Sequence, residues 1–308
     1  MSPARTVAVA VADEAAAGCC RRIVVYGNAM VDGADPEAHP RAQPRARLSS
    51  GLSPAQMAAF VEDGFVKIPR FAAPAVGEGM LARVIELARR AARGDDIAPA
   101  FVLAEQQADF ADRANDAAPE DSVSKIFRLG RDAVFNQFAV SRAVTDLVAA
   151  LVGSDDVDTF LSQFIFKNAG AWGQPWHQDA YYFPFDPPRP VIGVWLAVTE
   201  ATLENGCLHV LPGSHVEPVH AHVADRRPNA NYGYVEIVDH DTTNAKAVLM
   251  EPGDLLLFDS HLMHRSTDNV TARPRAAMVY HYACAGTRDR TVELRGYTVN
   301  DWLAARRA

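Results

Sequence analysis

The segment Trp176-His177-Gln178-Asp179-Ala180 carries the residues of this chain best suited to metal chemistry. If the segment is extended, His177 and Asp179 point the same way, because side chains alternate faces along a strand. A histidine and a carboxylate side by side can hold two adjacent positions around a metal ion. A second histidine from elsewhere would complete the two-histidine, one-carboxylate face of a non-haem Fe(II) site.

Eight histidines downstream are candidates for that second histidine: His209, His215, His220, His222, His240, His261, His264 and His281. A ligand is expected at or just after the end of a strand, near a turn that returns it over the mouth of a barrel. His261 and His264 both follow a predicted strand that ends at Phe258. Spacing favours this pair slightly and does not choose between its members.

Arg275 opens the last predicted core strand and suits a second requirement of such sites. Fe(II) oxygenases of this type usually need an electron-donating co-substrate, commonly 2-oxoglutarate, whose distal carboxylate is held by a fixed cation. Arginine does this best, because its planar guanidinium can donate two parallel hydrogen bonds. Arg275 and His281 share one strand face. We expect Arg275 near the metal at the mouth and His281 deeper in the fold.

The composition excludes several classes of protein. The chain has 308 residues, 49% of them apolar and 22% charged, and a formal net charge of -8. This balance argues against binding nucleic acid, which needs a basic face, and against binding an anionic membrane. No run approaches the roughly 20 apolar residues of a membrane helix. Asp13 and Glu14 cut short a faintly signal-like start, so we expect a cytoplasmic protein with a small-molecule substrate. The sequence carries no signal for an oligomeric state.

The order of elements predicts helices first and a β core afterwards. Residues 1–50 are expected to be a flexible extension, and residues 51–304 one domain. Helices are predicted over 54–63, 74–93 and 136–151, with 101–112 as a further candidate. Extended segments are predicted over 65–69, 124–129, 159–167, 190–199, 207–211, 247–250, 254–258 and 276–282. Many short strands without intervening helices favour a sandwich or barrel. The long stretch 216–246 suggests a lid or a substrate-binding insertion.

Three sequence features together resemble the phytanoyl-CoA dioxygenase family of Fe(II)/2-oxoglutarate-dependent oxygenases. They are His177-Gln178-Asp179, the segment Asn205 to His215 (NGCLHVLPGSH), and His264 followed eleven residues later by Arg275. The similarity runs from about Leu52 to about Asn300. It implies a mainly β fold with flanking helices, namely a double-stranded β-helix (jelly roll, cupin-like).

The resemblance also assigns roles to residues. It implies that His177, Asp179 and His264 bind Fe(II) and are the catalytic centre. It implies that Arg275 and Ser266 bind the distal carboxylate of 2-oxoglutarate. Trp195 matches a position that lines the co-substrate pocket, and Gln163 and Lys125 are further candidates for that pocket. The usual reaction of the family is hydroxylation of an unactivated C–H bond, in which O2 is consumed and 2-oxoglutarate becomes succinate and CO2.

Asp179 separates this chain from relatives that halogenate. Those relatives carry a small residue where the carboxylate would be, which leaves a metal position for chloride. Asp179 therefore favours hydroxylation, or a desaturation or ring closure by the same intermediate, over halogenation. Two other functions remain as alternatives. A zinc hydrolase could use two histidines and a carboxylate, but no general base stands in an HExxH-like context. The second alternative is a non-catalytic jelly-roll binding protein, which would have no reason to keep both the triad and Arg275.

The aromatic residues Trp172, Trp176, Tyr181, Tyr182 and Phe183 are expected to shield the site.

Overall fold

The computed structural model describes residues 51–107, 118–188 and 190–307. The predicted N-terminal extension, residues 1–50, lies outside the described residues. The helices are α1 (Pro54–Asp63), α2 (Pro74–Ala92), α4 (Ala133–Ala139), α5 (Arg142–Val152) and α6 (Thr291–Arg295), with 3-10 turns η1 (Pro119–Ser122), η2 (Asp179–Tyr182) and η3 (Ser214–Val216). The strands are β1 (Phe65–Ile68), β2 (Phe101–Ala104), β3 (Val123–Phe127), β4 (Val157–Lys167), β5 (Phe185–Asp186), β6 (Val191–Ala197), β7 (Leu208–Val210), β8 (Val223–Ala224), β9 (Val235–Glu236), β10 (Lys246–Val248), β11 (Leu255–Asp259), β12 (His264–Ser266), β13 (Arg275–Cys284), β14 (Arg288–Asp289) and β15 (Leu303–Arg306).

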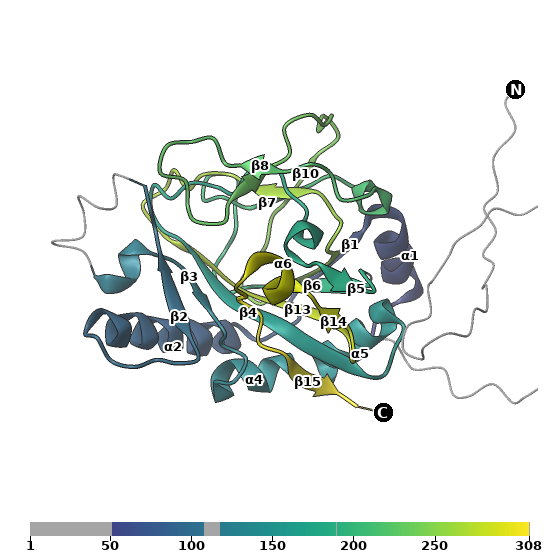
Figure 1. The fold of residues 1–308 in the computed structure, drawn as a ribbon, viewed down its shortest axis with the longest axis horizontal. Coiled ribbons are helices and arrows are strands. Elements are labelled where there is room, and N and C mark those ends of the chain that lie inside the picture. Colours follow the sequence, from purple (N-terminus) through teal and green to yellow (C-terminus); the bar gives the residue numbers. More distant parts are fainter. Residues whose placement is uncertain (1–50, 108–117, 189, 308) are drawn as a thin grey trace, which may run out of the picture.

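Two antiparallel sheets form the centre of the fold. The large sheet has the strand order β1-β11-β6-β13-β4-β3-β2, and β15 pairs with β4 at its side. The small sheet has the order β10-β7-β12. Figure 1 shows helices α2, α4 and α5 on one side of the large sheet and the small sheet on the other. The mainly β jelly roll with flanking helices is therefore confirmed.

Alternate side chains of strand β13 contribute to the cores on the two faces of the large sheet. Met278, Tyr280 and Tyr282 belong to the core beneath the helices. The alternate residues Ala277 and Val279 belong to the core beneath the small sheet. This follows from the two-residue period of a strand, which also turns Arg275 and His281 to the inner face. The helical side is completed by apolar residues of α2 and α5, among them Met80, Val84, Val144, Leu147 and Val148.

Local capping residues explain where the helices begin. Ser53 Oγ accepts from the backbone N–H of Gln56, and Gln56 Oε1 accepts from that of Ser53, a capping box that starts α1 as predicted. Gly64 ends the helix in the left-handed conformation. The predicted single helix over 136–151 is wrong, because Ser141 caps a second helix and divides the segment into α4 and α5.

The helix candidate over 101–112 is also wrong where the structure describes it. Residues 101–104 form β2, which pairs antiparallel with β3. Phe101 stacks on Phe127 of the neighbouring strand, with ring centroids 5.2 Å apart. Aromatic side chains pair well across strands, and here that pairing outweighs helix propensity. Residues 108–112 lie outside the described part of the chain. Within the described part, no helix has the length and apolar character needed to cross a membrane.

Candidate metal centre and co-substrate pocket

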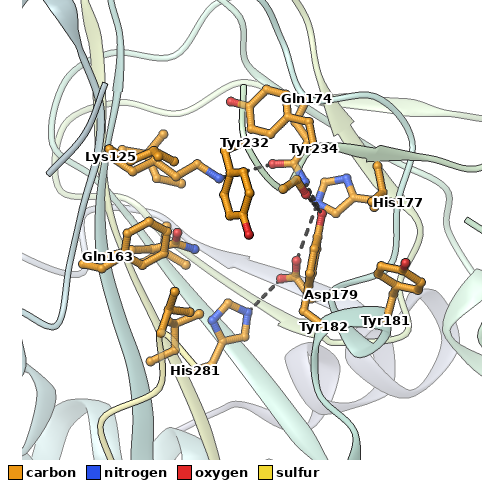
Figure 2. Close-up of a pocket in the computed structure, with 18 of the residues that line it drawn as sticks. Lys125, Gln163, Gln174, His177, Asp179, Tyr181, Tyr182, Tyr232, Tyr234 and His281 are labelled. Carbon is orange, nitrogen blue, oxygen red and sulfur yellow. Dashed lines mark hydrogen bonds and ion pairs between the residues drawn. The ribbon is translucent and has the colours of Figure 1, made fainter. Parts of the chain in front are cut away.

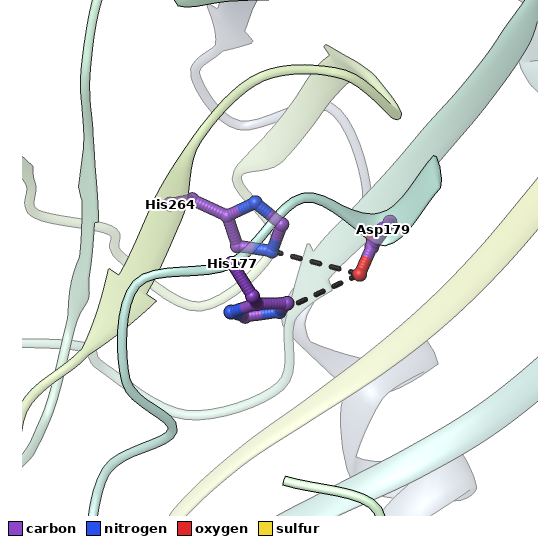
Figure 3. Close-up of side chains that lie close together, drawn as sticks. All are labelled: His177, Asp179 and His264. Carbon is purple, nitrogen blue, oxygen red and sulfur yellow. Dashed lines mark ion pairs between the residues drawn. The ribbon is translucent and has the colours of Figure 1, made fainter. Parts of the chain in front are cut away.

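His177, Asp179 and His264 come together, with their ligand atoms within 4.8 Å of one another (Figure 3). Nε2 of His177 lies 3.5 Å from Asp179 Oδ1, and Nε2 of His264 lies 3.8 Å from the same oxygen. The backbones of the two histidines form an antiparallel bridge with two hydrogen bonds of 2.9 Å. The chain is extended at Gln178 and turns into η2 at Asp179. The expected common direction of His177 and Asp179 is therefore present.

Both histidines are oriented by a backbone carbonyl. Nδ1 of His177 lies 2.8 Å from the carbonyl oxygen of Pro175, and Nδ1 of His264 lies 2.9 Å from that of Leu262. A carbonyl only accepts, so Nδ1 carries the proton and Nε2 presents its lone pair. Histidine ligands of metals are held in this way. The donor set, two Nε2 atoms and one carboxylate oxygen, therefore fits a divalent metal ion.

Burial and neighbouring charges keep Asp179 and His264 in the protonation states that a metal requires. Burial raises the pKa of Asp179, but the neighbouring His264 and His281 lower it by more, so its pKa lies well below the ordinary value. Burial, assisted by His177, lowers the pKa of His264 to about 4. A neutral imidazole and an ionised carboxylate are the forms that coordinate metals. His261, the rival candidate, lies outside this cluster and contacts Asp259 instead, with Nδ1 3.5 Å from Oδ1.

A cavity of about 530 Å³ opens beside the three residues. Its walls are mainly aromatic and aliphatic, and Figure 2 shows polar side chains converging on it. Tyr181, Tyr182 and Phe183 line it, as the sequence predicted. Trp172 and Trp176 do not; they lie against the guanidinium groups of Arg227 and Arg265. The prediction that these two tryptophans shield the site is therefore wrong.

Arg275 lines the cavity with an unsatisfied side chain. It is 2% exposed, and its Nη2 donates to the carbonyl oxygen of Gly206 at 2.8 Å. Its Nε and Nη1 have no hydrogen-bond partner in the described part of the chain. Burial lowers its pKa to about 10, which still leaves it charged at neutral pH. A buried cation with two idle donors is suited to an incoming carboxylate, because leaving such donors unpaired is costly.

Ser266 completes this end of the cavity with a hydroxyl whose proton is available. Its Oγ accepts from Lys167 Nζ and from the backbone N–H of Gln174, both at 3.1 Å. The hydroxyl proton can therefore be donated to a ligand. Lys167 is the register partner of Arg275 on the adjacent strand β4. Burial and the neighbouring Arg275 hold the pKa of Lys167 well below its ordinary value.

Trp195, Gln163 and Lys125 all line the same cavity. Val279 on β13 is the register partner of both Gln163 on β4 and Trp195 on β6, so the three side chains lie across adjacent strands. The Arg275 guanidinium lies 5.6 Å from the Trp195 ring centroid. Lys125 Nζ lies 3.4 Å from Gln174 Oε1 and 5.0 Å from the centre of the Tyr234 ring. Every predicted site residue therefore reaches one cavity.

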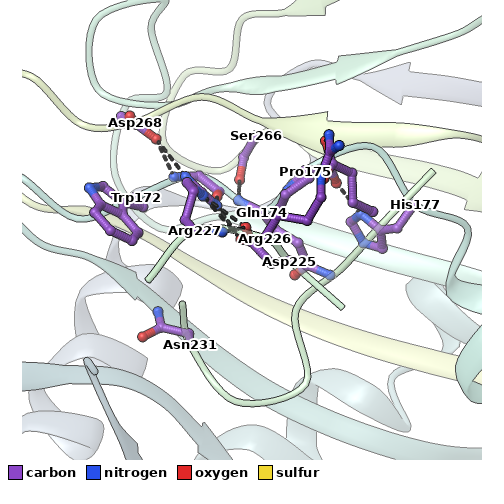
Figure 4. A network of polar contacts seen from close by, with 12 residues as sticks. Trp172, Gln174, Pro175, His177, Asp225, Arg226, Arg227, Asn231, Ser266 and Asp268 are labelled. Atoms are coloured by element: carbon purple, nitrogen blue, oxygen red, sulfur yellow. Dashed lines mark hydrogen bonds and ion pairs between the residues drawn. The ribbon is translucent and has the colours of Figure 1, made fainter. Parts of the chain in front are cut away.

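The stretch 216–246 covers part of this cavity, and its residues 232–235 line it. Arg227 fixes this stretch to the chain that leads into the metal centre (Figure 4). Its guanidinium donates to the carbonyl oxygen of Gly173 at 2.6 Å and pairs with Asp225 at 2.5 Å and with Asp268 at 3.6 Å. The insertion is thereby held over the pocket by ionic contacts as well as by packing.

Several residues of the site were missed by the sequence reasoning. Lys167 and Gln174 support Ser266, and Gln178 packs behind the metal centre. His281 was expected deeper in the fold, but its Nε2 lies 2.7 Å from Asp179 Oδ2. For Lys167 a signal existed, since it lies on the same strand face as Gln163. The roles of Gln174 and Gln178 depend on loop conformation, and that of His281 on where Asp179 of η2 lies, which no local pattern reveals.

These features define a class of protein: a jelly roll with a two-histidine, one-carboxylate centre beside a buried arginine. Residues 60–277 match the family model described as "Phytanoyl-CoA dioxygenase (PhyH)". The chain belongs to the phytanoyl-CoA dioxygenase family. The family resemblance noted from the sequence is thereby confirmed.

Individual relatives share parts of the chain. A "Probable phytanoyl-CoA dioxygenase" of Caenorhabditis elegans is 32% identical over 172 residues, which are 53% of this chain and 55% of the relative. The chain therefore spans about half the length of that protein. "Phytanoyl-CoA dioxygenase domain-containing protein 1" of Bos taurus is 28% identical over 271 residues, 77% of this chain and 92% of the relative. The crystal structure of EctD from S. alaskensis with 2-oxoglutarate and 5-hydroxyectoine has a TM-score of 0.59 at 21% identity, covering 78% of this chain and 79% of that one.

Proposed function

We propose that this protein is an Fe(II)- and 2-oxoglutarate-dependent dioxygenase that hydroxylates an unactivated C–H bond of a small organic substrate. The observation that carries the proposal is the placement of His177, Asp179 and His264 beside the idle donors of Arg275 in one cavity. In this proposal the three residues would hold Fe(II) through two imidazole nitrogens and one carboxylate oxygen.

The residues near Arg275 bind the co-substrate. Arg275 Nε and Nη1 and the Ser266 hydroxyl would receive the distal carboxylate of 2-oxoglutarate. Lys125, Gln163 and Trp195 form the adjoining wall. Fe(II) supplies the activation of O2, and one oxygen atom enters the substrate while the other enters succinate as CO2 leaves. The neighbouring structure with bound 2-oxoglutarate supports this choice of co-substrate.

The aromatic wall of the cavity positions the substrate and keeps solvent away. Tyr181 and Tyr182 of η2 and the following Phe183 line one side, and Tyr232 and Tyr234 line it from the insertion. Tyr182 is held in place because its hydroxyl donates to the carbonyl oxygen of Gly233 at 2.7 Å. A cavity of about 530 Å³ accommodates a small organic molecule beside the co-substrate. Holding the target bond close to the oxidising centre is the main contribution that such a wall makes to rate.

Two other functions use the same donor set and are less well supported. A zinc hydrolase would need a general base at the metal-bound water. Among the described residues that line the cavity, Asp179 is the only carboxylate, and it is itself in the donor set. A non-catalytic binding protein would not require idle cationic donors next to a metal centre.

The test uses anaerobic protein with Fe(II) and 2-oxoglutarate. We expect a weak visible charge-transfer band, and succinate release after O2 is admitted. Asp179→Ala and His264→Ala should each abolish both signals, whereas His261→Ala should retain the band. A native protein without the band, or a band that persists in the Asp179→Ala/His264→Ala double variant, would overturn the assignment. Tight Zn²⁺ binding without succinate formation would favour the hydrolase or the binding protein.

A further inference from the structure

A second group of two imidazoles and one carboxylate lies in the insertion, outside the residues that line the cavity. Glu217 Oε2 is 2.6 Å from Nε2 of His220 and 2.9 Å from Nε2 of His240. The three ligand atoms all lie within 4.8 Å of one another. The two imidazole rings have centroids 5.0 Å apart and planes at 76°, so they approach the carboxylate from different directions.

The hydrogen bonding of His240 favours a cation between its imidazole and the Glu217 carboxylate. Nδ1 of His240 lies 3.0 Å from the carbonyl oxygen of Asp241, which only accepts, so Nδ1 carries the ring proton. In the neutral imidazole, Nε2 then points a lone pair at the Glu217 carboxylate from 2.9 Å. Only a second proton or a metal ion between the two atoms makes this contact favourable.

The arrangement seen at His240 also occurs at the candidate iron centre. There, too, Nδ1 of each histidine faces a backbone carbonyl while Nε2 faces a carboxylate oxygen. The second group differs in its access to solvent, since the side chains of His240, His220 and Glu217 are 19%, 27% and 35% exposed. A metal ion can therefore enter from solvent and complete its coordination with water. Two histidines, one glutamate and water form a common tetrahedral ligand set for zinc.

Gln178 connects this group to the middle of the His177-Gln178-Asp179 motif. Its side chain is fully buried, and its Oε1 accepts from the backbone N–H of His220 at 2.8 Å. Its Nε2 donates to the carbonyl oxygens of Pro218 at 3.1 Å and of His261 at 2.8 Å. The chain between Glu217 and His220 is therefore fixed directly behind the candidate iron ligands.

We propose that Glu217, His220 and His240 form a second metal site, which takes a divalent cation of the zinc class. The bound ion links residues 217–220, near the start of the insertion, to His240, near its end. Because Gln178 holds the first of these parts, the ion stabilises the insertion against the back of the iron motif. The role is structural, since no residue of this group lines the cavity.

The experiment counts bound zinc in metal-stripped, full-length protein by equilibrium dialysis and elemental analysis. We expect two equivalents in the native protein, one in the candidate iron centre and one in the second site. His177→Ala/His264→Ala should retain one equivalent. His240→Gln and Glu217→Gln should also retain one, which additionally shows that these variants are folded. The control Glu236→Gln removes a carboxylate from the same insertion, where it pairs with Arg226, and should retain two.

A native protein that binds one equivalent, and a His177→Ala/His264→Ala variant that binds none, would overturn the second site while leaving the first intact. The group would then be an ion pair of Glu217 with protonated histidine. Hydrogen exchange provides a second readout that needs no variant of the second site. Zinc added to the His177→Ala/His264→Ala protein should slow amide exchange in residues 217–240. Unchanged exchange with zinc bound would overturn the stabilising role.

Discussion

His281 Nε2 donates a hydrogen bond to Asp179 Oδ2 at 2.7 Å, while Oδ1 of the same carboxylate faces the imidazoles of His177 and His264. The two carboxylate oxygens of Asp179 thus have different partners. One is fixed by a residue of β13 that is 1% exposed, and the other is turned toward the metal position. Strand β13 therefore supplies Arg275 at one end of the cavity and the support for Asp179 at the other.

Replacing His281 should weaken iron binding. In His281→Phe the shape is roughly kept, but Asp179 Oδ2 loses its donor and the carboxylate can rotate. Loss of such a supporting hydrogen bond typically costs about 10- to 100-fold in metal affinity. Fe(II) affinity measured by anaerobic competition with a chelator checks this expectation, and His281→Gln, which keeps a donor, should recover part of the loss.

Tyr282→Phe is the matched control for His281. Tyr282 is the next residue on β13 but faces the helices, where its hydroxyl donates to the carbonyl oxygen of Ala139 at 2.9 Å. Its loss should lower the free energy of unfolding by about 1 kcal/mol and leave Fe(II) affinity unchanged. Equal losses of iron affinity in the two variants would show that His281 acts only through general stability.

The sequence predicted the features that depend on strand period and on local caps. The inward face of β13, the start of α1 at Pro54 and a sandwich or barrel of short strands follow from such patterns, whereas the jelly roll was implied by the family resemblance. It also favoured His264, whereas spacing alone left His261 open. What separates the two in space is the bridge between the His264 and His177 backbones, a long-range pairing that no local pattern encodes.

The misses have a common physical cause. Gln174, Gln178 and His281 act through contacts with residues distant in the chain, so their roles appear only once loops are placed. The break between α4 and α5 had a local signal, since Ser141 is a good N-cap, but helix periodicity continues across it. The expectation that Trp172 faces the site failed because Arg227 of the insertion holds its ring.

Replacing Arg275 should raise the 2-oxoglutarate requirement. Arg275→Gln removes the buried cation and its two idle donors but keeps a polar side chain. Truncating one partner of a buried charge pair costs about 2–5 kcal/mol, so KM for 2-oxoglutarate should rise by at least about 30-fold. Succinate formation as a function of 2-oxoglutarate concentration measures this. Arg273→Gln, an exposed neighbour on the same segment, should leave KM unchanged; an unchanged KM in Arg275→Gln would refute the assigned role.

Gly206→Ala should disturb the support of Arg275. Gly206 has φ +88, and an added Cβ would lie 2.4 Å from Lys167 Cδ and 2.5 Å from the carbonyl oxygen of Thr267. The left-handed conformation alone costs about 1–2 kcal/mol for alanine, and the contacts force the turn to move. Because the Gly206 carbonyl accepts from Arg275, both Tm and the affinity for 2-oxoglutarate should fall.

The control for Gly206 is Gly286→Ala. Gly286 has φ +82, but an added Cβ would meet nothing within 4 Å. This variant isolates the backbone strain from the steric contacts at Gly206. It should lower Tm slightly and leave the affinity for 2-oxoglutarate unchanged. A Gly206→Ala protein that behaves like Gly286→Ala in both measurements would show that the turn does not position Arg275.

Lys125 should give 2-oxoglutarate use a pH dependence on the alkaline side. Burial lowers its pKa to about 8, although Asp179 and Glu105 raise it in part. A lysine is charged below its pKa, so kcat/KM for 2-oxoglutarate should fall as pH rises through about 8. Arg275, with a pKa of about 10, stays charged across this range. Lys125→Arg keeps its charge throughout, so it should flatten the pH profile of kcat/KM between roughly pH 7 and 9, about one unit either side of the lysine pKa. A fall of the same size in Lys125→Arg would exclude Lys125 as the titrating group.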